Sequence, residues 1–136
     1  MGTYTTPARA KVVTELLDAM QFYMKPGDEV LVYNSIPAVY FLTQTHPWLG
    51  LSWPDFESAV NIQNLILQKE IAGTKLPRIV RAKASVVNGA WPLDPQILPT
   101  WWQQGESRRV FGEFADKHGY VLAWSNDFFE ILIAPE

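Results

Sequence analysis

The alternation of helix-like and strand-like segments is the feature of this sequence that most limits its possible folds. Residues 7–24 repeat apolar positions at helical spacing, and Pro26 and Gly27 end that segment. Residues 29–33 form a short, continuous apolar run between turn signals, which predicts a buried strand. Further helices are predicted at 36–43, 55–72 and 107–118, and further strands at 78–84, 120–124 and 128–134.

This order of elements predicts one α/β domain that spans residues 1–136. Strands that alternate with helices normally form a parallel sheet covered on both faces. The right-handed crossover rule then gives a Rossmann-like three-layer sandwich, with a C-terminal antiparallel hairpin at the edge of a mainly parallel sheet. Residues 78–84 are less apolar than 29–33 and are expected at the periphery. The residues expected at the centre of the sheet are Val30, Val32, Ile79, Val80 and Leu122.

The apolar stripes of the predicted helices define the expected core. Asp55 is expected to cap the helix over 55–72, and Gly73 to end it. The helical residues expected to be buried are Leu16, Leu17, Met20, Phe56, Val60, Phe111 and Phe114.

Composition excludes several classes of function. The net charge is −3 and the 11 basic residues are scattered, which argues against a nucleic-acid partner. With no cysteine, the chain has no disulfide, no thiolate zinc site and no cysteine nucleophile. No apolar run reaches the ~18–20 residues that cross a bilayer. The chain as given is therefore expected to be soluble.

A candidate ligand site follows the first predicted strand. Asn34 and Ser35 stand at the edge of the sheet where open α/β folds often bind ligands, and they lead into a helix N-terminus that favours anions. The glycines of a phosphate-binding loop are absent, so Ser35 can equally be a simple helix cap. Arg81 and Lys83 fall on one side of the second predicted strand and could meet an anionic head group. The alternative is that both are solvated charges on a peripheral strand.

Groups for catalysis or metal binding are not visible in the sequence. His46 and His118 are the only histidines. A Ser35–His46 nucleophile pair would need an orienting carboxylate and an oxyanion site, and neither is visible. His118 is expected at a helix C-terminus, where a cation favours the helix dipole, and both histidines are expected to be structural. Four aspartates have no paired spacing that resembles metal ligation or a glycosidase pair, namely Asp28, Asp55, Asp94 and Asp116. We therefore predict no catalytic residue, no metal and no cofactor for this chain.

Tryptophans are concentrated in the predicted loops and form a candidate interface. Residues 85–105 hold three Trp and three Pro without a clear period, and a loop of about 20 residues is unusual in a compact domain. The rings could stack on sugars, lie at a membrane interface or dock a partner, or they could plug the ends of the core. As an interface, loops 46–54 and 85–105 should be neighbours and Trp48 should be partly exposed. The candidate interface residues are Trp48, Trp53, Trp91, Trp101 and Trp102.

Three segments together resemble a known class of proteins. They are residues 26–35 (PGDEVLVYNS) leading into 37–43, residues 76–80 (LPRIV), and Gly119-Tyr120 through 128–133 (FFEILI). This pattern resembles the soluble tail of GT-C-type membrane glycosyltransferases, the class that includes mannosyltransferases using polyprenyl-phosphate sugars. The catalytic acidic residues of that class lie in an early loop between membrane spans. Nothing in this sequence corresponds to that loop, so no catalytic residue is carried over.

The resemblance implies an accessory, non-catalytic domain on the extracytoplasmic (periplasmic) side of a membrane protein. Its partners would be the membrane-embedded part of the same polypeptide and a lipid-linked sugar. Two alternatives stay open. One is a free-standing α/β domain or enzyme that binds a small molecule at Asn34 and Ser35. The other is a protein-interaction module that uses the Trp-rich loops.

Overall fold

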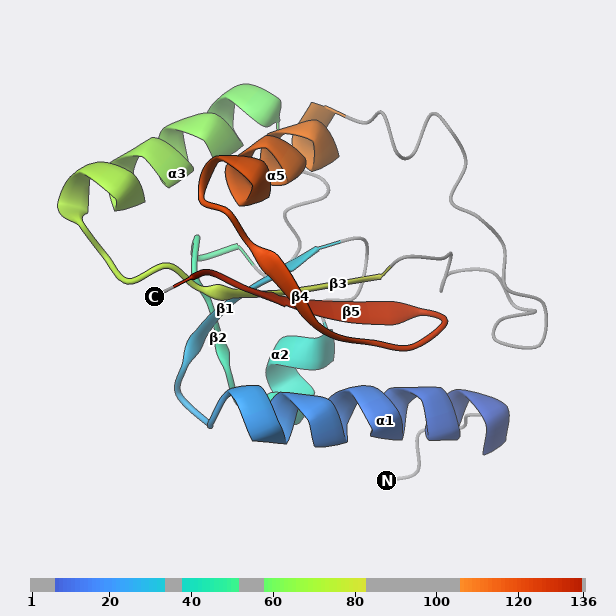
Figure 1. Ribbon diagram of the computed structural model, residues 1–136. Coiled ribbons are helices and arrows are strands. Elements are labelled where there is room, and N and C mark those ends of the chain that lie inside the picture. The colour runs from blue at the N-terminus through green and yellow to red at the C-terminus, as the bar shows by residue number, and fades with distance from the viewer. Residues whose placement is uncertain (1–6, 34–37, 52–57, 83–105, 136) are drawn as a thin grey trace.

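The computed structural model describes residues 7–33, 38–51, 58–82 and 106–135, and these form a sheet between two pairs of helices (Figure 1). The helices are α1 (Pro7–Tyr23), α2 (Ala38–Thr43), α3 (Ala59–Ala72) and α5 (Glu106–Lys117). The strands are β1 (Glu29–Tyr33), β2 (His46–Pro47), β3 (Arg78–Ala82), β4 (Val121–Ser125) and β5 (Phe129–Ile133). Strands and helices alternate much as the sequence predicts, with the additional short strand β2.

The sheet is mixed, with strand order β2-β1-β3-β5-β4. Strand β1 runs parallel to β2 and β3, whereas β5 runs antiparallel to both β3 and β4. The two antiparallel ladders align four residue pairs each, and the parallel ladders align four and only two. The prediction of a mainly parallel, Rossmann-like sheet is therefore wrong. The C-terminal hairpin enters the sheet beside the central strand β3 through β5, so antiparallel pairing takes the larger share.

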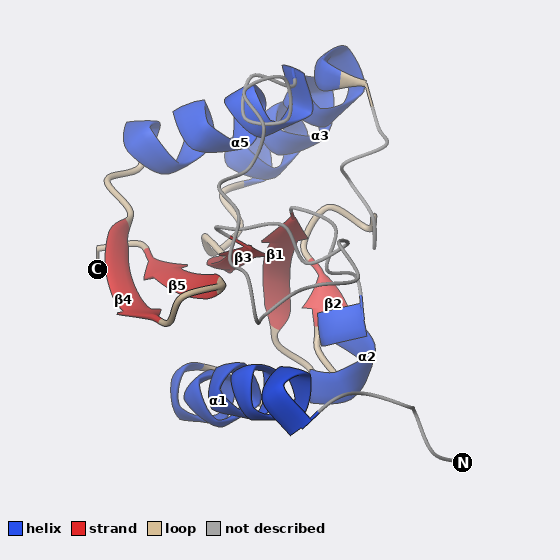
Figure 2. Cartoon of the chain, turned by 90° about the vertical axis from the view of Figure 1, so that its right-hand side faces the viewer, coloured by secondary structure: helices blue, strands red, loops and turns tan. Residues whose placement is uncertain are grey.

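Helices cover both faces of the sheet, as two perpendicular views show (Figures 1 and 2). Helices α1 and α2 lie on one face, where they close a core with Val30, Val32 and Val80. Helices α3 and α5 lie on the other face, where they close a second core with Leu31 and Ile79. Successive residues of a strand point to opposite faces, which explains why the continuous apolar run of β1 serves both cores.

Strand β3 is the third of five strands, so its expected peripheral position is also wrong. Its two arginines suggested an exposed strand, but each lies near an end of the strand and the residues between them, Ile79 and Val80, are completely buried. Leu122, expected at the centre, lies on the edge strand β4 and is 56% exposed. A strand that is antiparallel and at the edge can carry a half-solvated apolar side chain.

Helix α3 begins later than predicted. Ser58 is its N-cap and its side chain accepts a hydrogen bond from the Asn61 N–H at 3.2 Å, so the predicted cap at Asp55 is wrong. Gly73 ends the helix with φ 68°, as the sequence predicts.

Burial within the helices confirms part of the expected core. Leu16, Met20, Phe111 and Phe114 are buried, and Phe56 lies outside the described residues. Leu17 is only half-buried, because α1 turns Leu16 and Met20 toward the sheet. Val60 is exposed, because α3 buries Ala59, Ile62 and Ile66 and thereby turns Val60 outward.

Candidate functional site

Three side chains on neighbouring strands meet at the carboxyl end of β1 and β3. Arg81 is aligned with Tyr33 of β1 and with Glu130 of β5 in the two ladders. Its Nε donates a hydrogen bond to Glu130 Oε1 at 2.5 Å, and its Nη1 donates to the Tyr33 hydroxyl oxygen at 2.8 Å. The Tyr33 ring stacks on Phe111 of α5 with centroids 4.7 Å apart. The arginine is thus held on the face of the sheet that α3 and α5 cover.

The positive charge of Arg81 is balanced within this group of three side chains by the Glu130 carboxylate. Burial acts to lower the pKa of Arg81, but the Tyr33 phenol and the Glu130 carboxylate more than offset it and raise that pKa. Because Glu130 already balances the charge, an incoming anion would have to compete with a carboxylate. Asn34, Ser35 and Lys83 lie outside the described residues. A ligand-binding role for these three residues and for Arg81 stays a prediction.

Sequence reasoning missed Tyr33 and Glu130 as partners of Arg81. Their pairing depends on the register of β3 against β1 and β5, and the antiparallel placement of β5 was not foreseen. The available signal was the lone glutamate inside the apolar run 128–133, since a buried carboxylate needs a cation.

Trp48 is buried to 1% exposure, so the expectation that it would be partly exposed is wrong. The backbone N–H of Trp48 donates to Val30 O at 3.0 Å and thereby extends the pairing of β2 with β1. Its ring lies under α3 and α5, 5.4 Å from the Phe114 ring between centroids, with Lys69 Nζ 6.0 Å from the ring centre. Trp53, Trp91, Trp101 and Trp102 lie outside the described residues, and their interface role stays a prediction.

The two histidines occupy different settings. His46 is exposed on β2, whereas His118 Nε2 lies 2.6 Å from Glu70 Oε2, an atom that also accepts from Lys117 Nζ at 2.8 Å. The hydrogen bond from Lys117 lowers the pKa of Glu70 against the opposing effect of burial. This cluster ties the C-terminal end of α3 to that of α5, which is a structural role. Within the described ranges, no group of three or more His, Cys, Asp or Glu residues could hold a metal ion.

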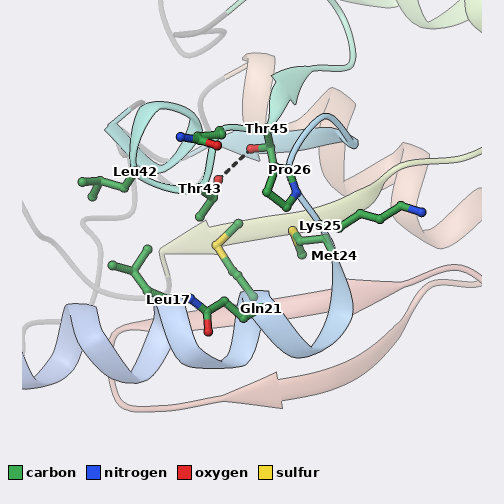
Figure 3. Close-up of a pocket in the computed structure, with 10 residues that line it drawn as sticks. Leu17, Gln21, Met24, Lys25, Pro26, Leu42, Thr43 and Thr45 are labelled. Carbon is green, nitrogen blue, oxygen red and sulfur yellow. Dashed lines mark hydrogen bonds between the residues drawn. The ribbon is translucent and has the colours of Figure 1, made fainter.

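A cavity of about 390 Å³ lies between α1 and the segment around α2 (Figure 3). Leu17, Met24 and Leu42 supply much of its apolar wall. Thr43 and Thr45 hydrogen-bond to each other at 2.8 Å through their hydroxyl oxygens, and Lys25 extends away from the cavity. Lys25 is the one titratable side chain among the described residues that line the cavity, and these residues suit an apolar group.

The outer face of α3, meaning its exposed residues between Val60 and Ala72, carries no charge. Val60, Leu67 and Ile71 are 67%, 51% and 77% exposed. The other exposed side chains of the helix are Asn61, Gln63, Asn64, Gln68 and Ala72. Both charged residues of α3 are turned toward the molecule. Lys69 Nζ lies 4.0 Å from a Glu29 carboxylate oxygen, and Glu70 bonds Lys117 and His118.

Comparisons with known proteins add no identity to this geometry. No family model matches the chain, and searches of curated proteins and of solved structures also give no match. In the described part of the chain, no helix is both long enough and apolar enough to span a membrane. The resemblance to GT-C-type tails therefore stays a prediction.

Proposed function

We propose that this chain is an accessory, non-catalytic domain of a membrane glycosyltransferase-like protein. It stands on the extracytoplasmic side and docks against the membrane-embedded part of the same polypeptide. The observation that carries the proposal is the uncharged outer face of α3, with Val60, Leu67 and Ile71 exposed and both charged residues turned inward. This face supports the accessory function that is implied by the three segments resembling GT-C-type tails.

A helix that only meets water normally carries charged side chains on its outer face. The outer face of α3 has aliphatic groups and primary amides instead. Aliphatic groups favour a weakly polar neighbour. Asn and Gln amides both donate and accept hydrogen bonds, so they can satisfy polar backbone and side-chain groups where a membrane domain meets water.

The size of this face favours a partner on the same polypeptide. A helix of 14 residues is about 21 Å long. With a helix width of about 10 Å, the strip covers roughly 200 Å². A standard interface between separate proteins buries roughly 800 Å² per partner. A tethered partner acts at an effective concentration on the millimolar scale, so a smaller surface suffices.

Under this proposal, the catalytic reaction takes place in the membrane-embedded part of the polypeptide. Arg81, Glu130, Glu70 and His118 are engaged with one another or with neighbouring strands and helices. Under this proposal the lipid-linked sugar is bound and activated outside this domain, which contributes position and support.

The proposal is tested on the natural protein in its own cells. An antibody raised against this 15.5 kDa domain should detect a larger polypeptide in the membrane fraction that resists extraction with alkaline carbonate. The epitope should be cut by a protease added from the extracytoplasmic side and protected from one added from the cytoplasmic side. A 15.5 kDa species in the soluble fraction would contradict the proposal.

A further inference from the structure

We propose that the cleft beside the start of β3 binds a single-chain amphiphile with an anionic head. The head, a phosphate or a carboxylate, is held by Arg78 and Lys75, and the apolar chain lies along the wall between the end of α1 and the β4–β5 hairpin. This cleft is on the opposite face of the sheet from α3. The inference is therefore independent of the docking proposed above.

Arg78 is a cation without a partner in the described residues. Its Nε is shielded from solvent and has no hydrogen-bond acceptor there. Arg81, also partly buried, differs from Arg78 because it bonds both Glu130 and Tyr33. A buried donor without an acceptor is destabilising, and an anionic ligand would remove that penalty while forming a charge-assisted hydrogen bond.

The register of the sheet places Arg78 away from the nearest carboxylate of β1. Arg78 is aligned with Val30, whose side chain belongs to the core under α1. Glu29 precedes Val30 and therefore points to the other face, where it lies 4.0 Å from Lys69 Nζ. Arg78 and Lys75 also line a neighbouring cavity together with Asp28 and Glu29. Even so, the Arg78 Nε has no acceptor in the described part of the chain, and Glu29 pairs with Lys69.

The cleft itself has an amphiphilic lining. Its volume is about 490 Å³, and among the described residues that line it, the charged ones are Lys75 and Arg78. The remaining lining residues are apolar or aromatic: Tyr23, Leu76, Pro77, Val121, Ile133, Ala134 and Pro135. The Tyr23 hydroxyl donates to Ala123 O at 3.0 Å, which turns its polar end to the backbone of β4. Two cations at one part of a largely apolar cleft match an anionic head with an alkyl body.

The experiment titrates the purified chain with n-decyl phosphate below its micelle concentration and follows amide and Arg78 Nε–H resonances by NMR. We expect saturable binding at the cleft. The affinity should exceed that for inorganic phosphate by roughly tenfold or more, since burial of two methylene groups contributes about that factor. The affinity for uncharged decanol should be lower by a similar factor, because decanol cannot use the two cations.

Two variants test the assignment. Arg78→Leu should weaken decyl phosphate binding by about tenfold or more through loss of a charge-assisted hydrogen bond. Val121→Glu places a carboxylate at an exposed position on the wall and should abolish binding without disturbing the core. Lys11→Met is the matched control, because it removes an exposed cation from α1 outside the cleft and should leave the affinity unchanged.

Several results would overturn the inference. Equal affinity for inorganic phosphate would remove the role of the apolar wall, and equal affinity for decanol would remove that of the cations. Binding that survives both Arg78→Leu and Val121→Glu would place the ligand elsewhere. Sedimentation with anionic phospholipid vesicles without saturable binding of decyl phosphate would indicate a membrane surface instead of a ligand cleft.

Discussion

At the scale of single residues, Tyr40 shows how this sheet compensates for its shortest strand. Strand β2 has only two residues, so it cannot pair with the whole of β1. The Tyr40 hydroxyl oxygen accepts a hydrogen bond from the Val32 N–H at 2.8 Å, and the hydroxyl donates to Val30 O at 3.1 Å. A side chain of α2 therefore satisfies the Val32 N–H of β1, which a longer β2 would otherwise pair, whereas Val30 O also accepts from the Trp48 N–H.

Replacing Tyr40 by Phe should lower the free energy of unfolding by about 1–3 kcal/mol, because it leaves a buried N–H of β1 without its acceptor. Urea denaturation followed by circular dichroism measures this change. Tyr23→Phe is the matched control, since it removes a hydroxyl that donates to Ala123 O in a half-buried setting and should cost less. Equal losses for the two variants would show that the Tyr40 hydroxyl does not have this special role.

At the scale of elements, the two helix glycines Gly73 and Gly112 differ in whether the backbone conformation requires glycine. Gly73 ends α3 with φ 68°, a conformation that side chains with a Cβ rarely adopt. Gly112 lies inside α5, and a Cβ placed there would meet no atom within 4 Å. The same substitution should therefore have opposite effects at the two positions.

We expect Gly73→Ala to destabilise the protein by about 1 kcal/mol, through strain at the left-handed position. Gly112→Ala should stabilise it by roughly 0.5–1 kcal/mol, because alanine favours the helix. Thermal denaturation of both variants gives the comparison. A gain at Gly73 would mean that α3 does not end in this conformation.

The register of α1 can be tested with two adjacent leucines. Leu16 is buried to 1% exposure, whereas Leu17 is half-buried and lines the α1–α2 cavity. Leu16→Ala should cost about 2–5 kcal/mol as a core truncation, and Leu17→Ala should cost clearly less. Urea titrations give the free energies of unfolding of both variants. A larger loss for Leu17→Ala than for Leu16→Ala would contradict this register.

Much of the element order could be predicted from the sequence, because strands such as 29–33 and helices such as 7–24 have clear periods and turn signals. Sheet order could not. Whether β4 or β5 pairs with β3 depends on contacts between distant segments. The Arg81–Glu130 pair, which allows a charged residue on a central strand, forms only when β5 is the neighbour of β3. The face of α3 also escaped prediction, because apolar residues lie all around the helix and Val60 was assigned to the core.

At the scale of the whole molecule, Glu70 joins the ends of α3 and α5 through Lys117 and His118. Its pKa is lowered from the ordinary value of 4.5, chiefly by the hydrogen bond from Lys117. A carboxyl with a lowered pKa in the folded state stabilises that state at pH above 4.5. This contribution is lost as the pH falls from there through the lowered pKa.

Glu70→Gln should therefore be less stable than the parent chain at neutral pH, with the difference shrinking as the pH falls below 4.5. Denaturation midpoints across a pH series measure it. Glu113→Gln is the control, because Glu113 pairs with Arg109 along one exposed face of α5 and contributes little. If the stability difference between Glu70→Gln and the parent chain stayed constant across the acid range, the contribution of Glu70 would not depend on its ionisation, which would contradict this prediction.

The proposed function requires that the outer face of α3 docks against the membrane-embedded part of the same polypeptide. Site-specific photo-cross-linking tests it most directly, with the photoreactive residue at Leu67 of the natural protein in its native membranes. Val121, an exposed aliphatic residue on β4, is the matched control position. We expect an internal cross-link from position 67 to a membrane-spanning peptide, identified by mass spectrometry, and none from position 121. Cross-links from position 67 only to separate proteins, or none at all, would contradict it.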